Sequence, residues 1–246
     1  MKRLLLLIIC LSGFGFAYTP SSFDSLLRTY VVDSGFVDYD AWAANPDDVA
    51  KLQSFVGEMA AHDPSGLSGT EQLAFWINAY NAFALHEVLN RYPTESIRPT
   101  FIGIPERSFF IDEVHVVNGE TYSLDGIEND ILRTLNEPRI HFAINCASAS
   151  CPVLRKEIYS SSVLDKQLTE QAVAFVNDPS RNSFDPATNQ ANISKIFDWF
   201  EGDFDAAGGV AAYLSQFAEG DAKTVLDSGE VSIDYLTYDW ALNEAQ

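Results

Sequence analysis

One histidine and two cysteines lie within eleven residues of each other in the middle of the chain, as His141, Cys146 and Cys151. A cysteine attacks a carbonyl group as its thiolate, so it needs a base such as histidine within hydrogen-bonding reach. We therefore predict Cys146 as a nucleophile and His141 as its base. This pairing would suit hydrolysis or acyl transfer at an amide or thioester bond.

A histidine base is usually oriented by a further carboxylate or amide. Glu128 precedes His141 by thirteen positions on a predicted helix and is the candidate for this role. Its carboxylate would fix the imidazole tautomer and stabilise the charged ring. The alternative is that Glu128 forms a structural salt bridge with Arg133 or Arg139.

Cys151 is the second candidate nucleophile, because it directly precedes Pro152. A helix beginning at Pro152 would lower the thiol pKa and offer backbone donors to an oxyanion. The alternative is a disulfide between Cys146 and Cys151 that closes a small loop. Both can hold, since a reversible bond would make the site redox-sensitive and keep the resting protein inactive until it is reduced.

Two asparagines, Asn78 and Asn81, stand three residues apart on an otherwise apolar predicted helix. Buried amides must find hydrogen-bond partners, so the two asparagines pin loops to this helix or, as the alternative, one of them steadies the catalytic loop or stabilises an oxyanion. Tyr80 between them is expected in the core. His62 and His86 are expected to have no role in the chemistry.

The helix that carries these asparagines is the clearest element in the sequence. Ser68 and Glu71 form a capping box, residues 73–89 are densely apolar, and Pro93 follows. Apolar residues on more than one face indicate a central helix packed on several sides.

The other elements surround this helix. We expect further helices over residues 21–32, 46–61, 124–135, 162–176 and 210–217, a helix or loop over 195–204, and strands over 114–117, 140–145 and 231–236. Asn118 and Gly119 predict a hairpin turn after the first strand. The strand over 140–145 would present His141 with Cys146 just past its end, where a loop can turn the sulfur back. These elements predict one α+β domain over residues 18–246.

The N-terminus has the features of a signal peptide over residues 1–17. Lys2 and Arg3 precede an apolar run too short to span a bilayer, and residues 15–17 form a small-x-small cleavage site. Lipidation at Cys10 is the alternative, but the small residue that lipoprotein processing prefers before its cysteine is missing. We predict export to the periplasm or the medium, with no membrane anchor after cleavage.

The composition excludes some classes of partner. The formal net charge is −20, and no cluster of lysine and arginine is present, so a nucleic acid partner is not expected. The acidic residues indicate a solvated surface or, as the alternative, a groove for a cationic substrate. No metal site is predicted, because the spacing of His115, His141, Cys146 and Cys151 matches no compact ligand pattern. No Gly-rich phosphate loop follows a predicted strand, and no cofactor is expected.

Several of these segments are similar to a known family. The motifs are residues 75–82, 123–128, 131–133 and 141–152. Together they resemble the domain of unknown function 547 family, in the right order and over about residues 37–240. The resemblance implies a papain-like or transglutaminase-like domain, with a central buried helix against a small, mostly antiparallel sheet, and cysteine-based hydrolysis. In such a fold His115 could be a second candidate base. The chain departs from the family at Asn129, where a histidine is common.

The prediction is thus an exported cysteine hydrolase or acyl transferase acting on a peptide or envelope polymer, with Cys146, His141 and Glu128 as its catalytic residues. The alternative is a non-catalytic envelope module that binds a peptide, glycan or protein and is stapled by a Cys146–Cys151 disulfide. The sequence predicts no particular oligomeric state.

Overall fold

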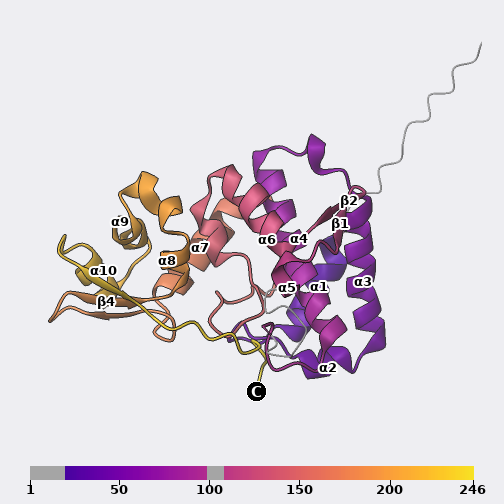
Figure 1. Ribbon diagram of the computed structural model, residues 1–246, viewed down its shortest axis with the longest axis horizontal. Helices are drawn as coiled ribbons and strands as arrows, with labels where there is room; N and C mark the ends of the chain where they lie inside the picture. Colours follow the sequence, from indigo (N-terminus) through magenta and orange to yellow (C-terminus); the bar gives the residue numbers. More distant parts are fainter. Residues whose placement is uncertain (1–19, 99–107) are drawn as a thin grey trace, which may run out of the picture.

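The computed structural model describes residues 20–98 and 108–246 of the chain (Figure 1). The fold is α+β, as the sequence predicts, with helices predominating over two small sheets. The predicted signal peptide over residues 1–17 lies outside the described residues. No helix within the described ranges is both long and apolar enough to cross a membrane.

The first helices pack around a longer central one. They are α1 (Pro20–Tyr30), α2 (Tyr39–Ala43), α3 (Pro46–Ala61), the 3₁₀ turn η1 (Pro64–Gly66) and the central α4 (Gly69–Arg91). The predicted capping box is present, since the Ser68 backbone N–H donates to Glu71 at 3.0 Å. Residues 73–85 of α4 are all buried, which confirms a helix packed on several sides.

A short α5 (Ser108–Ile111) leads into the predicted hairpin of β1 (His115–Val117) and β2 (Glu120–Tyr122). Asn118 and Gly119 form its turn with φ values of 50° and 81°, the left-handed conformation that such turns require. The hairpin packs on α4 through ring contacts, Phe83 with His115 and Trp76 with Tyr122.

The middle of the chain is helical where we expected a helix and a strand. It contains α6 (Leu124–Gly126), the π-helical η2 (Ile127–Leu132), and the 3₁₀ helices η3 (Arg133–Leu135) and η4 (Pro138–Phe142). The predicted helix over 124–135 is therefore present, although its centre is a π-helix. The predicted strand over 140–145 is wrong. Pro138 starts a 3₁₀ helix whose first turn Glu137 caps by accepting from the Arg139 N–H.

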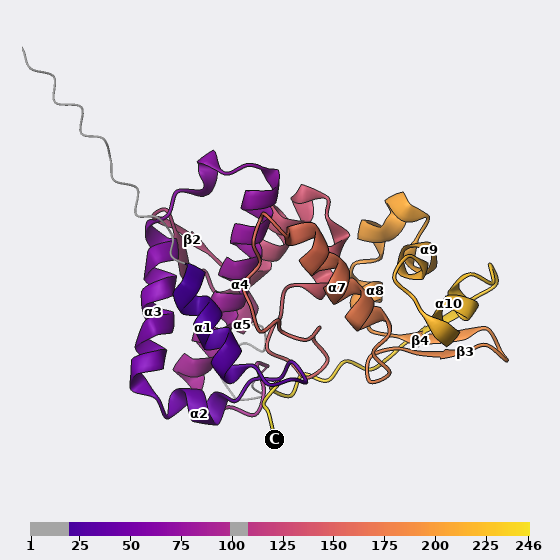
Figure 2. The same ribbon diagram turned by 180° about the vertical axis from the view of Figure 1, so that it is seen from behind.

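The remaining elements build the other end of the molecule (Figure 2). They are α7 (Leu164–Val176), β3 (Ser183–Asp185), β4 (Gln190–Ile193), α8 (Ile196–Trp199), the 3₁₀ helix η5 (Glu201–Ala207), α9 (Val210–Ser215), α10 (Gly220–Leu226) and β5 (Ser232–Tyr235). The predicted strand over 231–236 is confirmed as β5. The hairpin of β3 and β4 was not predicted.

The sheets differ from the arrangement that the resemblance implies. The three-stranded sheet has the order β3-β4-β5, with β4 antiparallel to β3 and parallel to β5. It lies far from α4, and α10 packs on it (Figure 1). The central helix therefore contacts helices and the small β1–β2 hairpin rather than a larger sheet.

Two hydrophobic clusters meet at η4. Ile140 packs in the cluster around α4, and Phe142 packs in the cluster around the three-stranded sheet. Helix α7 also contributes to both clusters, through Leu168 to the first and Phe175 to the second. His141 lies between the two clusters, because Ile140 before it packs in the first cluster and Phe142 after it packs in the second.

Asn81 on α4 holds the chain that follows η4. Its amide donates to the Ala143 carbonyl at 3.0 Å and accepts from the Asn145 N–H at 2.8 Å. Asn78, one turn earlier, makes the same pair of bonds to the backbone of Tyr159. Both asparagines therefore connect loops to the central helix, and the loop that Asn81 holds leads directly into Cys146.

We predict that Asn81→Ala lowers the free energy of unfolding by about 2–4 kcal/mol, because it leaves a buried carbonyl and a buried N–H without partners. Urea unfolding measures the change. Asn90→Ala, on the exposed end of the same helix, is the matched control and should change stability by much less. Equal effects of both substitutions would contradict the proposed role of Asn81.

Candidate active site

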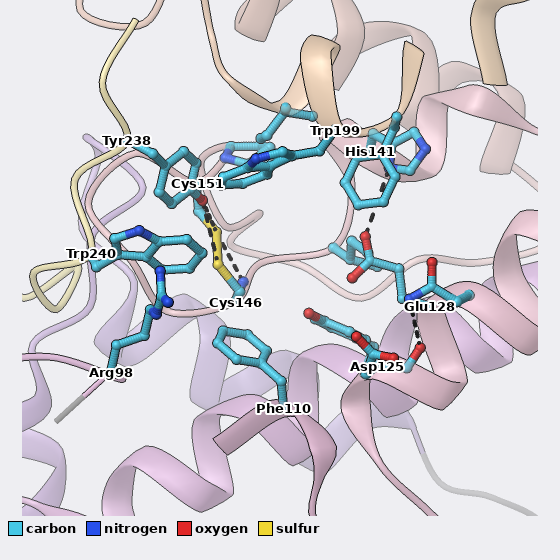
Figure 3. A pocket seen from close by; sticks show the side chains of 16 residues that line it. Arg98, Phe110, Asp125, Glu128, His141, Cys146, Cys151, Trp199, Tyr238 and Trp240 are labelled. Atoms are coloured by element: carbon cyan, nitrogen blue, oxygen red, sulfur yellow. Dashed lines mark hydrogen bonds and ion pairs between the residues drawn. A yellow bond between two sulfur atoms is a disulfide. The ribbon is translucent and has the colours of Figure 1, made fainter. Parts of the chain in front are cut away.

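A cleft of about 500 Å³ opens where the two clusters meet (Figure 3). Its polar wall carries Asp125, Glu128, Asn129 and His141, its sulfur wall carries Cys146 and Cys151, and its aromatic wall carries Tyr80, Phe110, Trp199, Phe200, Tyr238 and Trp240. All three predicted catalytic residues therefore line one cleft. Their contacts within it differ from the prediction.

Asp203 on η5 contacts two residues at the polar wall, Arg133 and His141. Its two carboxylate oxygens accept from Arg133 at 2.7 Å each, and one of them also lies 2.8 Å from Nε2 of His141. Burial alone would raise the pKa of Asp203. The hydrogen bonds from His141 and Arg133 outweigh burial and hold the pKa of Asp203 well below its usual range.

The sequence did not single out Asp203. It is one of 35 acidic residues, and 62 positions separate it from His141. Nothing local distinguishes it from the acidic residues that face solvent. Only the packing of η5 onto the end of η4 makes it the partner of His141.

His141 is a neutral, buried ring. It is 2% exposed and stacks on Phe200 with ring centroids 4.1 Å apart, and burial lowers its pKa despite the opposing effect of Asp203. Because Asp203 is ionised, the single ring proton of neutral His141 belongs on Nε2. The lone pair of Nδ1 then points toward Glu128, whose carboxylate lies 3.9 Å away.

Within residues 20–98 and 108–246, no lysine or arginine forms a salt bridge with Glu128. Arg133 is taken by Asp203 and Asn129, and Arg139 by Glu137 and Asp165, so the salt bridge we considered for Glu128 is not formed. Burial raises the pKa of Glu128 to about 7, and the neighbouring charge of Asp125 adds to the shift. Arg133 and a hydrogen bond from Tyr80 oppose it.

The contacts of Glu128 and His141 differ from those that the sequence predicts. Asp203, rather than Glu128, accepts the hydrogen bond that orients the imidazole. Glu128 is a carboxyl group that changes protonation near neutral pH and faces a cleft, which is what a general acid or base requires. The π-helical turn of η2 carries Glu128 and the neighbouring Asn129 into the wall, and such turns are frequent at functional sites.

The two cysteines face each other as a disulfide pair, with Cα atoms 6.4 Å apart. Cys146 is partly exposed, whereas Cys151 is 3% exposed. Their polar neighbours are Ser148 and Tyr238. No described histidine donates to either sulfur or accepts from it, so the predicted bond between His141 and Cys146 is absent from the described chain. No helix begins at Pro152 either, since the next helix is α7 at Leu164.

His115, the second candidate base, lies away from the cleft. Its ring stacks on Phe83 of α4 with centroids 4.6 Å apart, and burial lowers its pKa to about 4. A ring that is sealed against the central helix has no access to substrate. Within residues 20–98 and 108–246, no three His, Cys, Asp or Glu side chains gather as metal ligands.

Asn129 occupies the position where the similar family commonly has histidine. Its amide donates to the Asp125 carbonyl at 3.1 Å and accepts from Arg133 at 2.8 Å. It therefore helps to hold Arg133 against Asp203. The departure from the family thus falls on the cleft wall itself.

Comparison with known proteins identifies one relationship. The model of a family described as "Protein of unknown function, DUF547" matches residues 64–176, which include α4, the polar wall and both cysteines. No curated protein and no solved structure matches the chain.

We predict that Glu128→Gln changes the pH dependence of stability. A glutamate whose pKa is raised on folding stabilises the fold below its unfolded pKa, and this contribution is lost as the pH rises through about 7. The free energy of unfolding of the variant, compared with that of the wild type, should therefore rise by about 2–3 kcal/mol between pH 5 and pH 8. Urea unfolding at both pH values tests this. Glu120→Gln, on exposed β2, should show no such gain, and a pH-independent difference for Glu128→Gln would exclude the raised pKa.

Proposed function

Because residues 64–176 match the model of the DUF547 family, whose description assigns no activity, we propose a function from the cleft itself. The protein is an exported hydrolase or acyl transferase that acts on an amide or thioester bond in a peptide or envelope polymer. One observation carries this proposal: a carboxyl group with a pKa of about 7, Glu128, lines the same cleft as the two sulfurs.

Cys146 is the nucleophile once the disulfide is reduced. Cys146 is the more exposed of the two cysteine residues, so it is the one that a substrate carbonyl can reach. Attack by its thiolate forms an acyl-enzyme and releases an amine or a thiol, and a water or acceptor amine then removes the acyl group.

Glu128 moves the protons of this reaction. As a carboxylate it takes the thiol proton, and as a carboxylic acid it returns that proton to the leaving group. A pKa near the working pH makes both states accessible. His141 and Asp203 are positioning residues, because the imidazole is fixed by Asp203 and turns its Nδ1 lone pair toward Glu128.

The aromatic wall supports an extended substrate. Trp199 is 43% exposed, and its ring lies 4.8 Å from Tyr238 and 5.5 Å from Trp240, centroid to centroid. Flat, partly exposed rings with polar edges bind peptide planes and sugar faces. This wall lies directly beside the sulfurs (Figure 3).

The second candidate is the non-catalytic envelope module that binds a peptide, glycan or protein. The Cys146–Cys151 disulfide favours it, because an oxidised sulfur is no nucleophile and the bond staples the loop beneath the aromatic wall. Export in either case is proposed from the predicted signal peptide.

We predict that the reduced protein hydrolyses a p-nitrophenyl acyl ester with a rate that rises as the pH passes through about 7, where Glu128 becomes a base. Cys146→Ser should abolish this activity, and Glu128→Gln should lower it about 10²-fold or more. Glu120→Gln is the matched carboxyl control. Equal rates before and after reduction, or no rate in either state, would favour the binding module over the hydrolase.

A further inference from the structure

We propose that the Cys146–Cys151 disulfide is a thiol–disulfide exchange site with a fixed polarity, in which a thiol attacks Cys146 and Cys151 leaves as a thiolate. The partner is a dithiol reductant. This exchange does not depend on the acyl chemistry proposed above, because it needs only the oxidised pair and its hydrogen-bond donors.

Exposure selects the sulfur that is attacked. Cys146 is partly exposed on the cleft wall, and Cys151 is 3% exposed behind it. The close view shows both sulfurs next to Tyr238 on one side of the cleft (Figure 3). An incoming thiolate therefore reaches Cys146 first.

Hydrogen bonding selects the sulfur that leaves. The backbone N–H of Cys146 donates to Sγ of Cys151 at 3.0 Å, and the Tyr238 hydroxyl donates to the same sulfur at 3.3 Å. The Tyr238 hydroxyl lies farther from Sγ of Cys146, at 3.5 Å. Hydrogen bonds to a charged acceptor are the stronger ones, so these donors stabilise a thiolate at Cys151 more than at Cys146.

Ser148 extends this set of donors. Its hydroxyl lies 2.8 Å from that of Tyr238, 3.1 Å from Sγ of Cys146 and 3.3 Å from Sγ of Cys151, so its one proton goes to the tyrosine oxygen or to one of the two sulfurs. A proton given to Tyr238 polarises the bond from Tyr238 to Cys151. Burial raises the pKa of Tyr238, so its hydroxyl stays protonated and can donate a hydrogen bond to Cys151.

The surrounding loop holds these donors in place without the disulfide. Arg181 donates to the Cys151 carbonyl at 2.7 Å, and the Asn145 amide donates to the Pro152 carbonyl at 2.7 Å. The Ala147 N–H donates to the side chain of Asn145 at 2.8 Å. The Cys146 N–H and the Cys151 sulfur therefore keep their positions when the bond between the sulfurs opens.

The exchange proceeds in two balanced steps. In the first, a thiolate of the reductant forms a bond to Sγ of Cys146, the disulfide breaks, and its electron pair remains on Cys151 as a thiolate. In the second, the other thiol of the reductant, as its thiolate, attacks the reductant's own sulfur in the mixed disulfide and releases Cys146. The dithiol is oxidised by two electrons, and the protein is left with two thiols.

Trapping the mixed disulfide tests the polarity. The oxidised protein, with residues 18–246 intact, is treated with glutathione, quenched with iodoacetamide and mapped by mass spectrometry. We expect glutathione on Cys146 and carbamidomethyl on Cys151. Glutathione predominantly on Cys151, or equally on both, would overturn the proposal.

A second measurement tests the donors. Tyr238→Phe should slow reduction by dithiothreitol about tenfold and raise the pH at which the thiolate absorbance of the reduced protein develops. Tyr213→Phe removes a buried tyrosine hydroxyl outside the cleft and should change neither value. Unchanged reduction in Tyr238→Phe would contradict the role of the tyrosine, even if the variant were less stable.

Discussion

The site depends on one half-buried carboxylate, Asp203, and on the two groups that donate to it. Arg133 binds it with two hydrogen bonds and His141 with a third, so Asp203 is the acceptor for both the Arg133 guanidinium and the His141 ring proton. Glu128 has the imidazole of His141, the carboxylate of Asp125 and the hydroxyl of Tyr80 as neighbours. A carboxyl group that is buried beside a second carboxylate holds its proton to neutral pH, because burial and the neighbouring negative charge both disfavour its charged form.

The fold brings these groups together by joining two hydrophobic clusters through one short helix. In η4, Ile140 belongs to the cluster around α4 and Phe142 to the cluster around the three-stranded sheet. His141 has no place in either cluster and faces the cleft between them. Asn81 then fixes the chain after η4 to the central helix, so the cysteine loop starts from a defined position.

The sequence predicted the local features well and the long-range partners poorly. The capping box of α4 and the Asn118–Gly119 turn depend on neighbouring residues, and both are confirmed. The strand over 140–145 was wrong because its apolar residues face two different clusters, a pattern that resembles a buried strand when only sequence is considered. Asp203 was missed because its role exists only after η5 packs on η4, which no local pattern encodes.

The central claim is that Glu128 exchanges its proton near neutral pH while Asp203 remains ionised. Carbon-13 NMR of carboxyl-labelled glutamate, assigned with Glu128→Gln, measures this proton directly. We expect the Glu128 signal to titrate with a midpoint of about 7. A midpoint near the ordinary glutamate value of about 4.3 would show that the carboxyl group is solvated or paired, and would contradict the account of the cleft.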